Sequence, residues 1–198
     1  MCSKNKTRLL MLCLSLLAMP GLALAHDGLH SGSGWLAGLI HPFTGADHWL
    51  AMLAVGYWSV QQTNLRPYAV SLQFTLAMCL GASLGAAFGV VHLTEYLIAA
   101  SVLCGGLVMA MAVRVPVMAG VLAISVFGAA HGYAHGAELA PGMSLLAYAA
   151  GFTLASCLLQ ALGAALFLAR KRLASAGKLR FAGWGIVAYG IYLLGMGG

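Results

Sequence analysis

Two short polar clusters interrupt an otherwise apolar sequence, and each combines histidines with a carboxylate. The first lies in HPFTGADHWLAM and the second in FGAAHGYAHGAE. Their candidate metal ligands are His41, Asp47, His48, His131, His135 and Glu138. Neutral imidazole and carboxylate suit Ni²⁺, Co²⁺, Zn²⁺ or Cu²⁺, and no cysteine accompanies them, which argues against Cu⁺ or a structural zinc site. The two clusters therefore predict one shared metal site.

Spacing in the first cluster predicts one helical face. His41 and His48 are seven residues apart, or two helical turns. Asp47 is offset by about 100° from His48 and still reaches the same cavity edge. Because Pro42 suits the first turn of a helix, we expect the regular helix to begin there. His41 would then lie at its mouth, with Asp47 and His48 about halfway down.

Spacing in the second cluster also predicts one face. His131, His135 and Glu138 follow each other at i, i+4 and i+7. Counting about 1.5 Å per residue along the helix places His135 near the outer boundary of the membrane. Gly132 and Gly136 flank the histidines and leave room for a neighbouring helix or an ion.

Composition identifies an integral membrane protein, because 62% of the 198 residues are hydrophobic and 7% are charged. Soluble domains carry roughly a quarter of charged residues. The net charge of +6 is not a nucleic-acid signal, since the basic residues form no basic-aromatic face. The lipid bilayer is therefore the expected environment, and nucleic acid is not an expected partner.

Apolar runs predict an all-α bundle of six transmembrane helices. We expect spans near 35–60, 67–91, 95–113, 116–138, 143–169 and 181–197. All lysines and arginines after residue 25 fall in alternate loops, which predicts that both mature termini are periplasmic. The glycines at 81, 85 and 89 have the four-residue spacing that permits close helix packing.

The first 25 residues have the features of a secretory signal peptide. A basic n-region precedes the apolar stretch Leu9–Ala18, and Ala23-Leu24-Ala25 gives a small-x-small cleavage pattern. An uncleaved first helix is the alternative. Cleavage would leave residues 26–198 as one permease domain and His26 as its N-terminus. The free amine and His26, with His30 nearby, could then capture a metal ion. His92 and Glu95, in an outer loop, are expected to be solvated.

The motif residues resemble those of the HupE/UreJ family. Two segments show this resemblance: His41-Pro42-Phe43-Thr44-Gly45-Ala46-Asp47-His48 and the stretch from Phe127 to Glu138. The likeness extends to the signal peptide, the six spans and the histidine-containing mature start. It implies a bacterial inner-membrane permease for nickel or cobalt, linked to hydrogenase or urease maturation. By this resemblance, the six candidate ligands of the two clusters correspond to the functional positions of the family.

A secondary permease for Ni²⁺, or for Co²⁺, is therefore the predicted function, and the protein is expected not to be an enzyme. No nucleotide-binding motif suggests an ATPase partner, and the metal is cargo rather than a prosthetic group. An intramembrane zinc-dependent hydrolase is one alternative, although no further deep acid could serve as its general base. A membrane metal sensor or chaperone that does not transport is the other.

Overall fold

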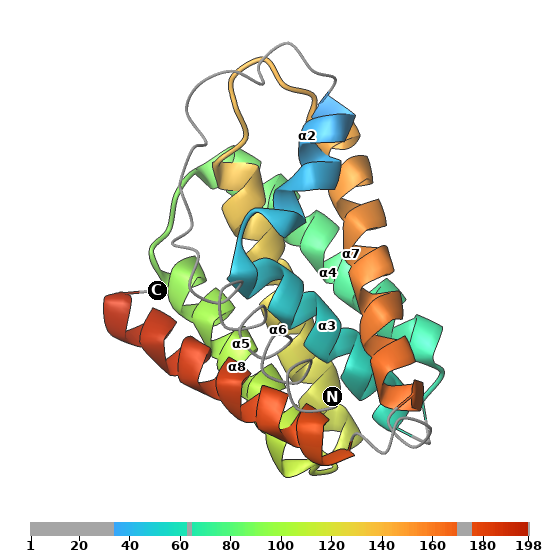
Figure 1. Ribbon diagram of the computed structural model, residues 1–198. Helices are drawn as coiled ribbons and strands as arrows, with labels where there is room; N and C mark the ends of the chain where they lie inside the picture. Colours follow the sequence, from blue (N-terminus) through green and yellow to red (C-terminus); the bar gives the residue numbers. More distant parts are fainter. Residues whose placement is uncertain (1–33, 63–64, 170–175, 198) are drawn as a thin grey trace, which may run out of the picture.

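The computed structural model describes residues 34–62, 65–169 and 176–197, and all regular structure in these ranges is helical (Figure 1). The elements are α2 (Gly34–Ile40), the 3-10 turn η1 (His41–Phe43), α3 (Ala46–Gln61), α4 (Pro67–Phe88), α5 (Leu93–Met111), α6 (Val117–Ala137), α7 (Leu145–Ala169) and α8 (Ala176–Met196). The expected all-α class is confirmed. The proposed signal peptide, His26 and His30 lie outside the described residues.

Five helices are long and apolar enough to cross a membrane: α4, α5, α6, α7 and the Gly177–Met196 part of α8. Their outward faces carry large apolar side chains such as Leu80, Phe88 and Leu146, which are 69%, 74% and 82% exposed. Such faces are stable against lipid and not against water. The chain is therefore a multi-pass membrane protein.

The expected first span at 35–60 is not one continuous helix. The α-helix α2 gives way to the short η1 turn, and regular α-helix resumes only at Ala46. Between them Gly45 has an extended backbone, with φ −115° and ψ 128°. The expectation that the regular helix begins at Pro42 is therefore wrong: Pro42 lies in η1, where its missing N–H group costs no helical hydrogen bond.

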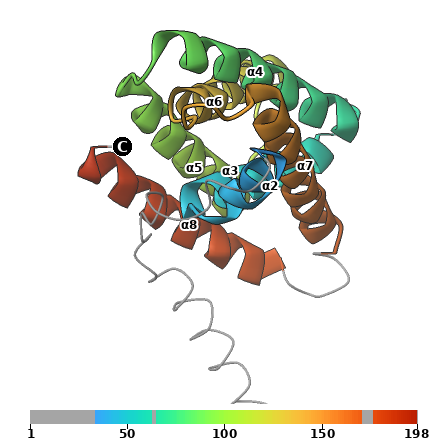
Figure 2. The ribbon, with the colours of Figure 1, turned by 90° about the horizontal axis from the view of Figure 1, so that it is seen from above.

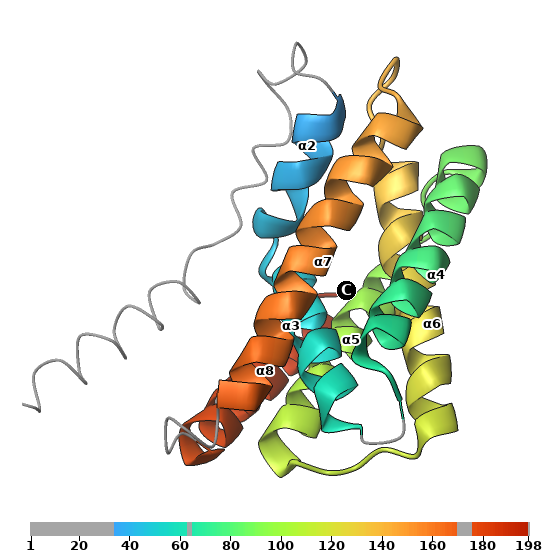
Figure 3. The ribbon, with the colours of Figure 1, turned by 90° about the vertical axis from the view of Figure 1, so that its right-hand side faces the viewer.

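Seen from above, α3 lies near the centre of the bundle, in contact with α4, α5 and α7 (Figure 2). Helix α2 packs along α7 and leaves Trp35 and Ile40 partly exposed. The long helix α7 packs along both α2 and α3, and α4 packs along α6 (Figure 3). On the far side of α3, α8 packs against α5. We call the end of the bundle that carries α2 the α2 end, and the opposite end, where α3 finishes, the Gln62 end.

Glycines bring α4 and α6 into direct backbone contact. A Cβ added at Gly81 would overlap with the carbonyl oxygen of Ala129, and one added at Gly132 would overlap with that of Met78. The close approach expected from the glycine spacing is thus confirmed for this pair. Gly89 is different, because it ends α4 with φ 78° and contacts no helix.

This packing predicts different effects for two glycine-to-alanine changes. Gly81→Ala should lower the thermal midpoint of the detergent-purified protein by roughly 2–12 °C, because overpacking typically costs about 1–3 kcal/mol. Gly185→Ala in α8 is the matched control, since a Cβ there meets open space. Equal midpoints for the two variants would contradict the tight α4–α6 contact.

Candidate metal centre

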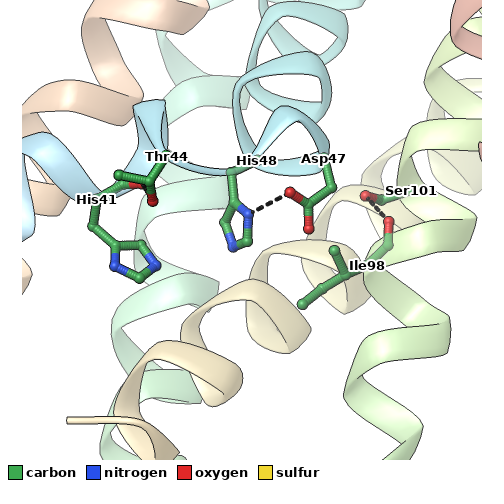
Figure 4. A network of polar contacts seen from close by, with 6 residues as sticks. All are labelled: His41, Thr44, Asp47, His48, Ile98 and Ser101. Carbon is green, nitrogen blue, oxygen red and sulfur yellow. Dashed lines mark hydrogen bonds and ion pairs between the residues drawn. The ribbon is translucent and has the colours of Figure 1, made fainter. Parts of the chain in front are cut away.

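The break between α2 and α3 brings His41 and His48 together. Seven residues of continuous helix would separate them by about 10 Å along the axis. Their ring centroids are instead 5.8 Å apart. Figure 4 shows both side chains projecting from the two sides of the break into the same space. The two rings are therefore closer than the expected two-turn separation, while the depth of His41 and His48 in the membrane stays a prediction.

Helix α6 contributes two further imidazoles to the same space. The ring centroid of His135 lies 4.5 Å from that of His41 and 4.7 Å from that of His48. His131, one turn along α6, stacks on His48 at 5.2 Å. The two sequence clusters, more than 80 residues apart, thus meet in one group of four histidines, which we call the histidine cluster.

Three members of the histidine cluster have the geometry of a metal site. One ligand nitrogen from each of His41, His48 and His135 lies within 4.8 Å of the others. Nitrogens that share an ion at about 2.1 Å are roughly 3–4 Å apart, so small rotations of the rings would close the site. A cavity of about 10 Å³ adjoins His135 on its other side, between α4 and α7, and is lined mostly by apolar side chains rather than by His41 or His48.

Asp47 fixes the orientation of His48. Its Oδ1 atom lies 2.9 Å from His48 Nδ1 (Figure 4). With Nδ1 donating to this carboxylate, His48 Nε2 is left free to bind a metal, the arrangement by which carboxylates orient metal-bound histidines in many proteins. Asp47 also lies in the first turn of α3, where its negative charge offsets the positive end of the helix dipole.

Gly45 permits this arrangement through its lack of a side chain. Its φ and ψ angles are open to any residue. A Cβ there, however, would lie 2.9 Å from His48 Nδ1 and would also crowd Asp47 Oδ1. Thr44 closes the preceding turn, because its hydroxyl donates to the His41 carbonyl oxygen at 2.7 Å. The break is thus built from short-range contacts of the motif itself.

Several buried ring nitrogens in the cluster have no hydrogen-bond partner among the described residues. They are His48 Nε2 and both ring nitrogens of His131 and of His135. Buried polar atoms in folded proteins almost always have a partner, and leaving one unpaired costs about 1–3 kcal/mol. Each neutral imidazole has one lone pair and one N–H group, so up to three of these five atoms can bind a cation. The remaining N–H groups would need acceptors such as water.

Acidic side chains lie toward the α2 end of the cluster. Glu138 is exposed and follows the last residue of α6, one turn beyond His135. Glu95, in the first turn of α5, is half-buried, and both carboxylates act electrostatically on His48. Glu95 was expected in a solvated outer loop, with a role at the entry as the alternative, and it lies instead in the first turn of α5. Carboxylates this close to the imidazoles favour the approach of a cation.

Comparison with known proteins identifies the family. Residues 14–193 match the family described as HupE / UreJ protein. This chain belongs to the HupE/UreJ family. It is 37% identical over 183 residues to Protein HupE of Rhizobium leguminosarum bv. viciae, covering 91% of this chain and 94% of the relative. No solved structure matches it. The resemblance inferred from the motif residues is thus confirmed.

The cluster geometry predicts how single changes in this HupE/UreJ protein affect metal affinity. His48→Ala and His135→Ala should each weaken Ni²⁺ binding more than about 100-fold. Asp47→Asn should weaken it by roughly 10–100-fold, the usual effect of losing an orienting partner. Titration calorimetry of the purified protein measures each affinity.

His92→Ala serves as the control, because His92 is an exposed histidine outside the cluster. An affinity that falls as much for His92→Ala as for His48→Ala would contradict the assignment. So would an unchanged affinity in His135→Ala.

Proposed function

We propose that this chain is a secondary permease that imports Ni²⁺, or Co²⁺, across the bacterial inner membrane for the maturation of a hydrogenase or a urease. The observation that carries the proposal is the histidine cluster at a broken helix inside a multi-pass bundle. Membership of the HupE/UreJ family and the similarity to Protein HupE support it. The α2 end would face the periplasm, with both mature termini on that side.

A broken helix within a membrane protein is itself an argument for a transport site. Backbone groups freed by a break are tolerated only where protein buries them or where they line a cavity. Transporters use such discontinuous helices to build ion sites near the bilayer centre. Here the break at Thr44 and Gly45 places His41 and His48 beside α6, which a continuous helix would not do.

The steps of import follow from the order of charges along the bundle. The carboxylates of Glu95 and Glu138 would attract the cation to the α2 end. His41, His48 and His135 would then bind it, while Asp47 holds His48 in the required tautomer. His26 and His30, which precede α2, would collect ions before this step. A membrane potential that is negative inside favours divalent cation uptake by about 4.6 kcal/mol per 100 mV.

The proposal predicts potential-driven uptake by the purified protein in liposomes. Wild-type protein should admit ⁶³Ni²⁺ when valinomycin sets an inside-negative potential, and Asp47→Ala and His48→Ala should each reduce the initial rate more than about 100-fold. His92→Ala should keep the wild-type rate. Absence of uptake by the wild type would refute the permease, and uptake that survives His48→Ala would refute the site.

The same preparation separates the two other functions. A zinc-dependent hydrolase would show hydrolytic activity that is lost on chelation and would not depend on potential. A sensor or chaperone would bind the metal with the affinities predicted above and would admit none of it. Potential-dependent influx is expected only from a permease.

Acid should inhibit uptake, because protons and the metal compete for the same imidazole nitrogens. The initial rate of ⁶³Ni²⁺ influx should fall as the pH on both sides is lowered from neutral, with the potential held constant. The apparent affinity for Ni²⁺ should weaken in parallel. A rate that rises toward acid pH would instead indicate that protons drive the transport.

A further inference from the structure

Gln160 in α7 is a buried polar side chain that the histidine cluster does not use. It is 1% exposed, and neither of its amide atoms has a hydrogen-bond partner among the described residues. Ser156, one turn earlier, is fully buried, and its hydroxyl contacts Met78 Sδ at 4.0 Å. Amide groups buried without a partner are rare in folded proteins, so a partner such as water or an ion is expected at this position.

Gln160 continues a strip of α7 that begins at the histidine cluster. Tyr148, Phe152, Ser156 and Gln160 are spaced by four residues and are all buried. The ring of Phe152 lies 4.2 Å from that of His135. Two helical turns of α7, or about 12 Å, separate Phe152 from Gln160 in the direction of the Gln62 end.

Helix α3 carries polar side chains from the level of Gln160 toward the Gln62 end, among them Ser59, whose hydroxyl donates to the Gly56 carbonyl oxygen. A Cβ added at Gly56 would overlap with the carbonyl oxygen of Gln160, which places these two residues side by side. Ser59 follows within one turn and is 2% exposed, and the side-chain nitrogen of Gln62 is buried without a partner among the described residues. Buried polar groups of α3 and α7 therefore gather between the histidine cluster and the Gln62 end.

Apolar side chains pack around Phe152, the residue of α7 that contacts His135. They include Met52, Phe74 and Met78, which are at most 3% exposed. Ser156 contacts Met78 of this apolar group. Gln160 lies about two turns beyond Phe152 along α7, so it is set apart from His135.

Gln73 is an example of a glutamine that links two helices in this bundle. Its Nε2 donates to the carbonyl oxygen of Val121 at 3.1 Å and lies 2.6 Å from Ser125 Oγ, so it joins α4 to α6. Interhelical hydrogen bonds of this kind are a common role for membrane glutamines. Gln160 has no such bond among the described residues, which distinguishes it from a packing residue.

We propose that Gln160 and Ser156 form a second binding station for the transported divalent cation, on the Gln62 side of the histidine cluster. The inference rests on the proposed permease function. Neutral amide and hydroxyl oxygens are weaker ligands for Ni²⁺ than imidazole and suit a cation that keeps part of its water shell. A weak station beyond a strong one lets the ion leave the histidines and proceed toward release.

Transport and binding measurements on Gln160→Leu test this station. The change keeps the side-chain size and removes the amide. The initial rate of ⁶³Ni²⁺ influx into liposomes should fall at least about tenfold, while the equilibrium affinity, set by the histidine cluster, stays within about twofold. Gln73→Leu is the matched control and should keep the wild-type rate. Equal rates for wild type and Gln160→Leu would overturn the inference, as would an equal loss in Gln73→Leu.

Gln160→Glu gives a second test that needs no transport. A carboxylate of the same shape binds a divalent cation more tightly, so equilibrium dialysis with ⁶³Ni²⁺ should find one more ion per chain than in the wild type. An unchanged number would show that cations do not reach this position and would overturn the inference. If the wild type shows no influx, the permease proposal fails separately, and the dialysis alone decides whether the station exists.

Discussion

An interrupted helix inside a membrane leaves backbone groups that lipid cannot satisfy, and this constraint governs the whole structure. The chain stops being helical at Thr44 and Gly45, within the bundle. Protein covers part of the break, because α7 packs along α2 and α3 and His135 of α6 lies against His41. Phe43 and Thr44 remain exposed on the other side. The same break turns His41 back toward His48, so the feature that must be buried also creates the metal-binding geometry.

Small residues make that enclosure possible. The glycines of α4 and α6 allow the two backbones to touch, and Gly38 and Gly151 do the same for α2 and α7. These contacts hold His135 at a fixed distance from the break. Packing and site are therefore coupled: a side chain added at a helix crossing would move α6 or α7 and separate the imidazoles. Because the helices on both sides of the break are packed closely, the imidazole rings need to move only a short distance to bind an ion.

The residue types and the helical periodicity predicted the all-α class. They also predicted that the two polar clusters share one site. Both features can be read from short stretches of sequence. The break was not predicted, since Pro42 was interpreted as a helix start and the contact of Gly45 with Asp47 and His48 is visible only in three dimensions. Gln160 was missed because it is the only amide side chain in the apolar run of α7. Glu95 was undervalued because its distance from His48 depends on how α5 packs.

The central claim is that imidazoles from both sides of the break and from α6 bind one ion together. X-ray absorption spectroscopy of the Ni²⁺-loaded protein tests it most directly. The account predicts an imidazole-rich first shell with three histidines at about 2.1 Å, reduced to two in His135→Ala. A first shell made only of oxygen ligands, or one that His135→Ala leaves unchanged, would contradict it.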